Sequence, residues 1–445
     1  MASLFSQKVD IQQSTRFNKS ASQIEQTLAI GERRFTTTYQ APKKCSKSAE
    51  TAWIQAFLTG CPATFPFTER KIRIADLFCA AGGLTTGVRS AARSLGIDSE
   101  VALAVDADLQ ALEIYQANHG PWLASGADVH SMVNFKVDGR GDDARWGTWP
   151  TLLEPHMSGY LSNLDLLCAG PPCQGHSNLN NKTRRNDSRN LLYLTTVAFV
   201  VAVGARICII ENVPEVLNDS NDAVRTARAL LLKSGYRIDD RVLSADAFGV
   251  PQRRRRHFLV GVRNYGHDFD LGDLLKPLEI PGLTVRQGIG DLASVKSSLP
   301  FDSNGKLSDD NVRRINWLFE NDAYELINKE RPDCHQNGHT YPSNYGRMSW
   351  DAPAQTITTG FLSPGRGRFV HPSKRRTITP HEAARLQGFP DSYTFEAAGR
   401  PSTRTLLSKV IGDAVPPLLA RAVALGTLSL DIVSGKSGES ESKKR

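Results

Sequence analysis

The sequence lacks paired cysteines and long hydrophobic runs. Its seven cysteines, at positions 45, 61, 79, 168, 173, 208 and 334, are odd in number and include no C-x-x-C pair. This spacing argues against a disulfide framework, so we expect reduced thiols in a cytoplasmic protein. No apolar run approaches the length of a membrane span, and the start, MASLFSQKVDIQQS, lacks the cationic and apolar regions of a secretory signal. We therefore expect no membrane partner.

Metal ligands are sparse as well. The nearest approach to a cluster is Cys334 and His335 with His339, which lacks the second pair of ligands of a zinc site. We expect no bound metal.

Negative charge is in deficit. The 445 residues include 54 Lys and Arg against 46 Asp and Glu, which gives a formal net charge of +8. This excess favours an anionic partner, and nucleic acid is one candidate. The hydrophobic share of 40% and the charged share of 22% are those of an ordinary soluble protein, and the length suits two domains.

The N-terminal extension, residues 1–70, has few apolar positions at its start. Residues 1–50 are rich in Gln, Ser, Thr and Lys, so we expect a loosely ordered arm there. Apolar residues at helical spacing then predict one amphipathic helix over 49–58 that docks on the core.

From residue 73 onward, short apolar segments alternate with helical ones. This alternation predicts an α/β fold with a mostly parallel sheet. We expect strands over 73–78, 101–106, 165–169, 207–211, 237–244 and 257–262. We expect helices over 84–95, 109–118, 188–204 and 222–234.

The alternation stops near residue 264. The following stretch, to about residue 375, is rich in Pro, Gly, Arg and Asn and predicts a smaller, loop-rich domain inserted into the first. Helical patterns return over 379–388 and 409–428, within a C-terminal segment, 376–430, that rejoins the first domain. The polar tail, 431–445, is expected to be disordered.

Cys173 follows an apolar strand and two prolines in the string GPPCQG, residues 170–175. The prolines stiffen the turn that presents the thiol, and open α/β sheets bind ligands at the carboxyl ends of their strands. Cys173 is therefore a candidate nucleophile, although an isolated cysteine is more often packing material.

A glycine-containing turn, DLFCAAGGLTTG at 76–87, joins the first strand of this region to a helix and could bring backbone amides close to a ligand. The next strand ends at Asp106, where an acid suits the ribose hydroxyls of a nucleoside cofactor. Tight strand-to-helix packing would explain the glycines equally well.

Glu211 ends another apolar strand, and burial would raise the pKa of its carboxyl so that it can donate a proton near neutral pH. Like Asp76, Asp106 and Cys173, it is expected at the carboxyl edge of the sheet. Four consecutive arginines, 253–256, enter a further strand, so alternate side chains should point in opposite directions.

Together these strings resemble the cytosine-C5 DNA methyltransferase family over residues 72–428. The matching strings, in the order of the family, are DLFCAAGG, GPPCQGHS, DSRN at 187–190, ENV at 211–213, QRRRR at 252–256, RLQGFPDSY at 385–393 and IGDAVPP at 411–417. The resemblance implies a Rossmann-like fold that binds S-adenosylmethionine, with a catalytic domain at 71–263 and a target-recognition domain at 264–375. It also implies a monomer that acts on double-stranded DNA.

The resemblance also assigns roles to residues. Cys173 would add to C6 of a cytosine, Glu211 would contact N3 and the amino group, and Arg256 would contact the carbonyl, with Arg254 as its alternating partner. Asp138 competes with Asp128 for one position of the cofactor pocket. The residues implied for that pocket are Phe78, Gly82, Asp106, Asp128, Pro172, Leu192 and Asp413.

Two positions depart from the family pattern. Ala80 replaces a usual glycine, and its methyl group could narrow the turn beside the cofactor. Asp413 replaces a usual asparagine, so a carboxylate that only accepts hydrogen bonds takes the place of an amide that both accepts and donates them. We still expect an active enzyme.

The target-recognition segment holds candidate base readers, among them Arg347, Gln355, Arg366 and Arg368. Three alternatives to sequence-specific DNA methylation stay open. RNA methylation would usually come with a Cys-Phe-Thr string, which is absent here. A silent DNA-binding regulator would normally lose Cys173 or Glu211, and a cysteine hydrolase would leave the other strings unexplained. A cognate restriction endonuclease is a possible partner.

Overall fold

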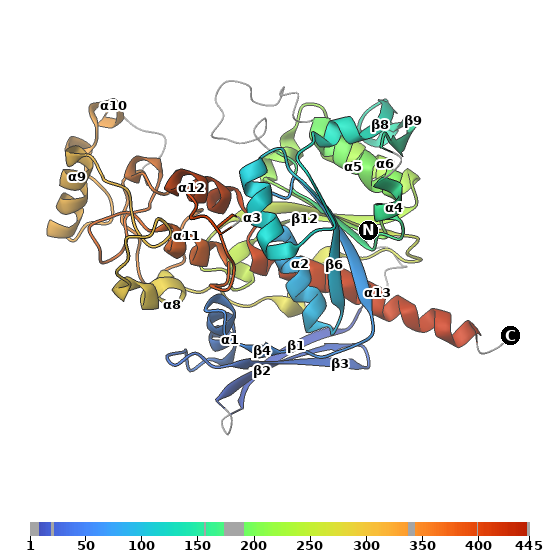
Figure 1. Cartoon of the computed structure of the whole chain (residues 1–445), viewed down its shortest axis with the longest axis horizontal. Coiled ribbons are helices and arrows are strands. Elements are labelled where there is room, and N and C mark those ends of the chain that lie inside the picture. The colour runs from blue at the N-terminus through green and yellow to red at the C-terminus, as the bar shows by residue number, and fades with distance from the viewer. Residues whose placement is uncertain are drawn as a thin grey trace.

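The computed structural model describes residues 9–18, 22–154, 157–172, 191–336, 343–397 and 399–442 (Figure 1), with the backbone alone at 158, 334, 335 and 435–442. Its centre is a seven-stranded sheet in the order β12-β13-β11-β10-β5-β6-β7. Neighbours from β11 to β7 pair in parallel, whereas β13 is antiparallel to both β11 and β12. The strands are β5 (Lys71–Leu77), β6 (Asp98–Val105), β7 (Leu123–Ser125), β10 (Leu166–Ala169), β11 (Ile207–Asn212), β12 (Tyr236–Ser244) and β13 (Arg255–Arg263).

Helices cover both faces of this sheet. Side chains of a strand point alternately to the two faces, so Ile207 and Ile209 of β11 pack in one core cluster and Cys208 and Ile210 in the other. The first cluster includes α2 (Gly83–Ser94) and α13 (Pro417–Ser442). The second includes α5 (Leu191–Val203), α6 (Ala223–Lys233) and residues of the hairpin β8 (Val133–Asp138) and β9 (Arg145–Leu152). The expected α/β architecture is thus confirmed.

The expected elements of this region match observed ones within a few residues, and α3 (Leu109–His119) completes the set. The helix expected over 188–204 is observed as α5, and residues 188–190 lie outside the described part. The sequence pattern missed β7, β8 and β9, because these strands are short or largely exposed and lack an apolar run.

The expectation of a loosely ordered arm over residues 1–50 is wrong for residues 11–18 and 23–40. They form β1 (Ile11–Asn18), β2 (Gln23–Ile30) and β3 (Arg33–Gln40), which continue to β4 (Ala63–Thr64) in one antiparallel sheet. In β2 every second residue is buried, and Gln, Glu and Thr fill the positions between, so composition concealed an alternating strand pattern. The docking helix is confirmed as α1 (Ala49–Leu58), with Ser48 accepting a hydrogen bond from Thr51 N as its N-cap.

The described part of residues 264–375 consists of short helices joined by loops, at the left of Figure 1. Its first part, 271–283, packs in the core shared by α13 and the N-terminal sheet. Residues within 285–292 and 348–397 share a core with residues 406–414, whereas Ile315, Leu318, Leu326 and Val370 form a separate cluster. The α-helices of this region and of the segment after it are α7 (Leu271–Leu275), α8 (Val285–Ile289), α9 (Asp309–Glu320), α10 (Asp333–Gln336), α11 (Pro380–Gln387) and α12 (Arg404–Asp413).

The C-terminal helix pattern differs from the expectation. The single helix expected over 409–428 is split between α12 and α13, because Pro416 and Pro417 cannot continue a helix. The expected disorder from residue 431 is also wrong at its start, because Asp431 forms ion pairs with Arg70 and Arg206. The stretch 404–434 is long and apolar enough to cross a membrane, but 83% of its most apolar window is buried inside the protein, as in a core helix.

Candidate active site

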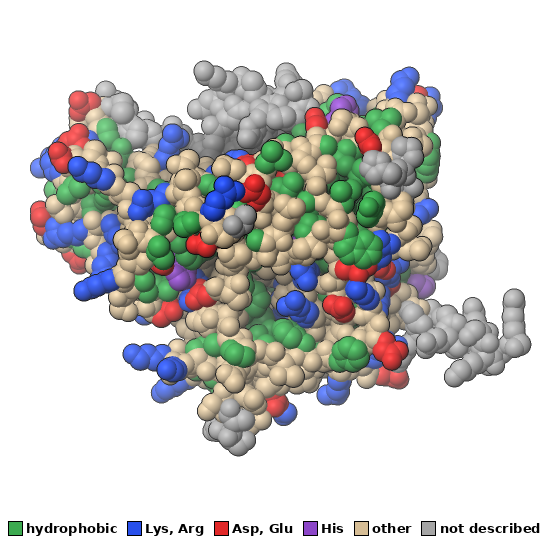
Figure 2. All heavy atoms as spheres, viewed as in Figure 1, with side chains coloured by type: hydrophobic (Ala, Val, Ile, Leu, Met, Phe, Trp, Pro, Cys, Tyr) green, Lys and Arg blue, Asp and Glu red, His purple; other side chains and the backbone are tan. Residues whose placement is uncertain are grey.

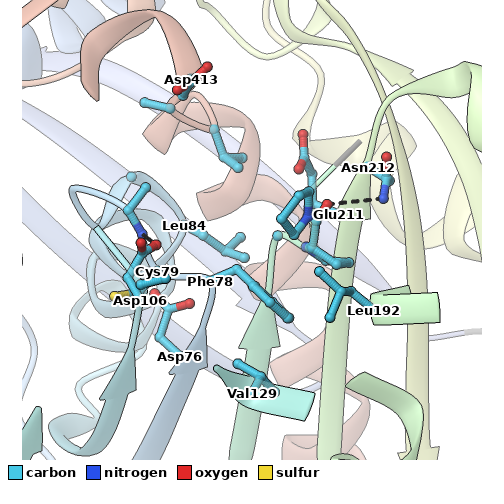
Figure 3. Close-up of a pocket in the computed structure, with 18 of the residues that line it drawn as sticks. Asp76, Phe78, Cys79, Leu84, Asp106, Val129, Leu192, Glu211, Asn212 and Asp413 are labelled. Carbon is cyan, nitrogen blue, oxygen red and sulfur yellow. Dashed lines mark hydrogen bonds between the residues drawn. The ribbon is translucent and has the colours of Figure 1, made fainter. Parts of the chain in front are cut away.

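A cavity of about 450 Å³ opens at the carboxyl edge of the parallel strands (Figure 3). Its walls come from the ends of β5, β6, β10 and β11, from the start of α5 and from residues 409–415. The structure thus gathers in one cavity residues that lie more than 300 positions apart in the sequence. The expected site residues that line it are Phe78, Asp106, Asp128, Pro172, Leu192, Glu211, Arg256 and Asp413.

Cys173 lies outside the described residues. The two residues before it, Pro171 and Pro172, line the cavity. Asn212 Nδ2 donates a hydrogen bond of 3.3 Å to the carbonyl oxygen of Pro171, the dashed line of Figure 3. Sequence analysis gave Asn212 no role, although an amide beside a strand-end acid is a usable signal. The described part of the turn is therefore tied to the strand that carries Glu211.

Glu211 is 7% exposed and faces this cavity. Its Oε1 lies 2.7 Å from Nε of Arg256. Burial raises the pKa of the Glu211 carboxyl, and the positive charges of Arg256 and Arg254 oppose that rise. A buried carboxyl with a raised pKa can hold a proton to higher pH and donate it.

Arginines 253–256 alternate as expected. Arg253 and Arg255 are exposed, whereas Arg254 is buried and Arg256 nearly so. Arg254, however, does not line the cavity. Its Nη1 donates to Ile357 O at 2.7 Å and its Nη2 to Gly412 O at 3.1 Å. The geometry therefore gives Arg254 a positioning role that joins the start of β13 to the loop at Ile357 and to the C-terminal turn of α12.

The turn after β5 has an unusual backbone. Phe78 and Ala80 both have a positive φ, 55° and 43°. The Ala80 amide donates to Asp106 Oδ2 at 2.7 Å, and Asp108 N donates to Asp106 Oδ1 at 2.8 Å. Asp106 thus holds the turn in place as well as facing the cavity, and burial raises the pKa of its carboxyl.

Gly82 is not among the lining residues, whereas its neighbour Gly83 is. A Cβ atom at Gly82 would lie 2.6 Å from Nε2 of His119, so this glycine permits close packing behind the turn. At Gly83 a Cβ atom would lie 2.3 Å from Val415 O. The two glycines thus permit close contacts of the turn with His119 and with Val415, and of these two residues only Val415 lines the cavity.

Asp76 is a site residue to which sequence analysis assigned no role beyond its place at the strand end. It is 1% exposed and lines the cavity. Its Oδ2 accepts a hydrogen bond of 2.6 Å from Thr85 Oγ1, whereas the buried Oδ1 has no partner in the part of the chain that the structure describes. Burial raises the pKa of its carboxyl to about 7, and the nearby Asp106 adds to the rise. A cationic ligand group would satisfy this oxygen.

Of the remaining acidic residues, Asp128 and Asp413 line the cavity and Asp138 does not. Asp128 lines the cavity, and its Oδ1 accepts from His130 N at 2.9 Å. Asp138 ends β8 and lies outside the cavity lining, so the structure favours Asp128 of the two. Asp413 lines the cavity beside Lys409, which forms an ion pair with Asp108. No sequence motif indicated Lys409. Burial raises the pKa of Asp413, and the charge of Lys409 opposes that rise.

The four candidate base readers fall into two pairs. Arg347 donates to Pro372 O at 2.9 Å and contacts Asp322, and Arg368 donates to backbone carbonyls and to Glu325. These two arginines are occupied within the protein. Gln355 and Arg366 are exposed.

No group of three or more His, Cys, Asp or Glu side chains that could hold a metal ion occurs among the described residues. The side chains of Cys334 and His335, and all of His339, lie outside that part of the chain.

Comparisons with known proteins agree on one family. A family model described as C-5 cytosine-specific DNA methylase matches residues 72–427. Type II methyltransferase M1.BsuMI of Bacillus subtilis is 38% identical over 362 residues, 81% of each chain. Type II methylase M.HgiDII of Herpetosiphon aurantiacus is 30% identical over 79% of this chain and 93% of the relative. Among solved structures, the S. pombe Dnmt2 methyltransferase has a TM-score of 0.54 at 20% identity and covers 81% of this chain and 98% of that one, a likeness of fold.

Proposed function

This chain belongs to the C-5 cytosine-specific DNA methylase family, and from that premise we propose how its residues methylate C5 of cytosine in DNA. The observation that carries the proposal is the single cavity that Phe78, Asp106, Pro172 and Glu211 all line. One end suits a nucleoside cofactor, and the other suits a target base.

S-adenosylmethionine fits the first end. Phe78 offers a ring for a base, Asp106 and Asp128 offer acceptors for hydroxyl and amino groups, and Leu192 offers apolar contact. The buried Oδ1 of Asp76, which lacks a partner among the described residues, suits a positively charged group. Bound there, the sulfonium of the cofactor supplies an electrophilic methyl group.

The residues at the other end activate the cytosine. The Cys173 thiolate forms a bond from Sγ to C6, while Glu211 gives its proton to N3, so that C5 gains the electron density of an enamine. C5 then bonds to the methyl carbon as the bond from that carbon to sulfur breaks. A base takes the C5 proton, N3 returns its proton to Glu211, the C5–C6 double bond re-forms, and the Sγ–C6 bond breaks to release the thiolate.

Arg256 positions the acid in this sequence. Its guanidinium contacts Glu211 and also lines the cavity, where its remaining donors can reach the carbonyl oxygen of cytosine. Arg254 acts through the backbone carbonyls of Ile357 and Gly412, so it fixes the C-terminal turn of α12, which carries Asp413. This separates one contact residue from one positioning residue in the same motif.

The partner we propose is duplex DNA with one cytosine turned out of the helix, because Glu211 is only 7% exposed and a base paired within a duplex could not reach it. Arg253 and Arg255 are exposed on the strand entry beside this cavity, and Gln355 and Arg366 are exposed in the loop-rich region. Arginines on such a rim contact phosphates, whereas Gln and Arg can read base edges. We further propose that the protein acts as a cytoplasmic monomer, with a cognate restriction endonuclease as a partner.

Sequencing of chemically or enzymatically converted DNA from a methylation-free host tests this function. We expect one short motif methylated by the wild type and unmethylated with Cys173→Ala. Methylated host RNA without methylated DNA would replace DNA by RNA as the substrate. Sequence-specific DNA binding without any methylated base would identify a silent regulator.

A further inference from the structure

A second cavity, of about 310 Å³, lies behind the turn that carries Gly82, on the side away from the active site. Its walls come from two sources. Tyr39, Phe57 and Phe65 belong to the N-terminal region, which precedes the family match at residue 72. Arg89 and Arg93 of α2 face them. Figure 2 shows basic side chains on the surface over α2, above apolar side chains of the N-terminal region.

The charge of Asp98 acts on Arg89, but no acid contacts either arginine directly in the part of the chain that the structure describes. In the described part of the chain neither forms an ion pair with a carboxylate, and the buried Nε of Arg89 has no hydrogen-bond partner. Burial and the neighbouring charge of Arg93 both lower the pKa of Arg89. Two guanidinium groups that share a half-buried cavity without a counter-ion attract an anion, and their geometry suits phosphate.

The opposite wall is aromatic. Tyr39 and Phe65 pack edge to face at 6.1 Å, and with Phe57 they give the cavity an apolar side. Such rings suit a planar ring system, and the volume is that of a small-molecule site. The combination of a phosphate-binding end and an aromatic end is that of a nucleotide site.

A chain of hydrogen bonds links this cavity to the cofactor turn. Arg89 Nη1 donates to His119 Nδ1 at 3.3 Å, which leaves the His119 proton on Nε2, 3.3 Å from Thr86 Oγ1. Thr86 Oγ1 in turn donates to Gly82 O at 2.7 Å. Burial lowers the pKa of His119 to about 3, so the ring is neutral and can accept from Arg89 as this chain requires.

We propose that this cavity is a regulatory site for a nucleoside monophosphate and that its occupation weakens cofactor binding at the active site. A phosphate on Arg89 draws the guanidinium away from His119 and loosens the hold of Thr86 on the Gly82 carbonyl. The coupling rests on the proposed occupation of the active-site cavity by S-adenosylmethionine, whereas the binding of the nucleotide does not.

Calorimetric titration of the full chain with AMP tests the site. We expect AMP to bind to the wild type. The double variant Arg89→Gln, Arg93→Gln should bind AMP about tenfold or more weakly, because it loses charge-assisted hydrogen bonds to the phosphate. Arg33→Gln with Arg34→Gln, exposed on β3 outside the cavity, is the matched control and should leave AMP binding unchanged. Arg93→Gln alone changes an exposed side chain, so it weakens AMP binding without risk to the fold.

Two further arms identify the ligand and the site. Inorganic phosphate and adenosine should each bind more weakly than AMP if both ends of the cavity are used; phosphate binding as tight as AMP would reduce the proposal to an anion site. In AMP titrations at increasing concentrations of S-adenosylhomocysteine, the affinity for AMP should fall by a factor that levels off at about fivefold. An AMP affinity that keeps falling as the S-adenosylhomocysteine concentration rises would indicate direct competition. That result would place AMP in the active-site cavity and overturn the proposal.

The remaining outcomes are equally decisive. AMP binding that the double variant leaves unchanged would overturn the site. AMP binding with no effect on S-adenosylhomocysteine would retain the site and overturn the coupling. A failure of the proposed methylation would leave both AMP measurements on the free protein interpretable.

Discussion

Arg256 places its Nε 2.7 Å from Oε1 of Glu211, at the end of the cavity where the target base is proposed to bind. Two opposing influences therefore act on the pKa of the Glu211 carboxyl. Burial raises the pKa of Glu211, and Arg256 lowers it. The balance decides over which pH range Glu211 can donate a proton.

Glu211→Gln should reduce methyl transfer by about 10²- to 10⁴-fold, the usual contribution of a general acid. Glutamine keeps the size of the side chain, so the unfolding temperature should change little. Single-turnover transfer of a labelled methyl group, with thermal unfolding in parallel, measures both. A variant that merely unfolds would show that the carboxyl serves the fold.

Arg256→Gln should lower the rate and also move its pH dependence. Glu211 acts in its protonated form, so activity falls as pH rises through its folded-state pKa. Without the cation that pKa rises further, and the alkaline limb of the rate profile moves to higher pH. Rates between about pH 5 and pH 10 test this, with the exposed Arg255→Gln as control. An alkaline limb that stays in place would show that Arg256 does not act through Glu211.

Cys173→Ala should abolish methyl transfer, because no other group is proposed to form the bond to C6. Binding of S-adenosylhomocysteine should be close to that of the wild type, since the thiolate acts only in the covalent step. Calorimetric titration and a methylation assay measure these separately. Comparable turnover by the variant would refute the assignment of the nucleophile.

Ala80→Gly should stabilise the protein by about 1 kcal/mol, because a positive φ strains any residue with a Cβ atom. Ala81→Gly is the matched control. Ala81 is buried and does not have a positive φ, so glycine there should destabilise. Denaturant unfolding of both variants measures the difference. Two changes of the same sign would show that the turn at Ala80 is not strained.

Asp76→Asn should remove a pH dependence of stability. The folded-state pKa of about 7 lies above the ordinary value of 3.8, so the folded protein binds the extra proton between these values. Its stabilisation is complete below about pH 4 and is lost as pH rises through 7. By that linkage the loss is on the order of 2 to 4 kcal/mol. The fall in unfolding free energy from pH 5 to pH 8 should be smaller in the variant, and an equal fall in both would contradict the assignment.

Much of the sheet could be predicted from the sequence, because its central strands are buried on both faces. Residues 166–169 are apolar throughout and 207–212 are apolar up to Glu211, so each apolar strand and the site residues at or just after its end appear in one pattern. The N-terminal sheet could not be predicted from the sequence, since Gln26 and Thr37 are buried among residues whose composition indicated disorder. A count of residue types ignores their alternation.

The site was predictable where a residue ends a strand and was not where a partner comes from far along the chain. The acceptors of Arg254 lie 103 and 158 positions away and are backbone carbonyls, which no side-chain motif marks. Lys409 and Asp108 are separated by 301 positions. Asp76 was visible at its strand end, but the burial that raises its pKa became evident only with the packed fold.

The first and last parts of the chain share one core. Arg421 of α13 donates to Gln26 Oε1 of β2 at 2.7 Å and to Ser94 Oγ of α2 at 3.1 Å, and its guanidinium lies over Trp53 of α1. During synthesis, therefore, the apolar faces of the N-terminal sheet and α2 await a helix that begins only at Pro417. A nascent chain that ends before residue 417 exposes those faces to solvent and chaperones.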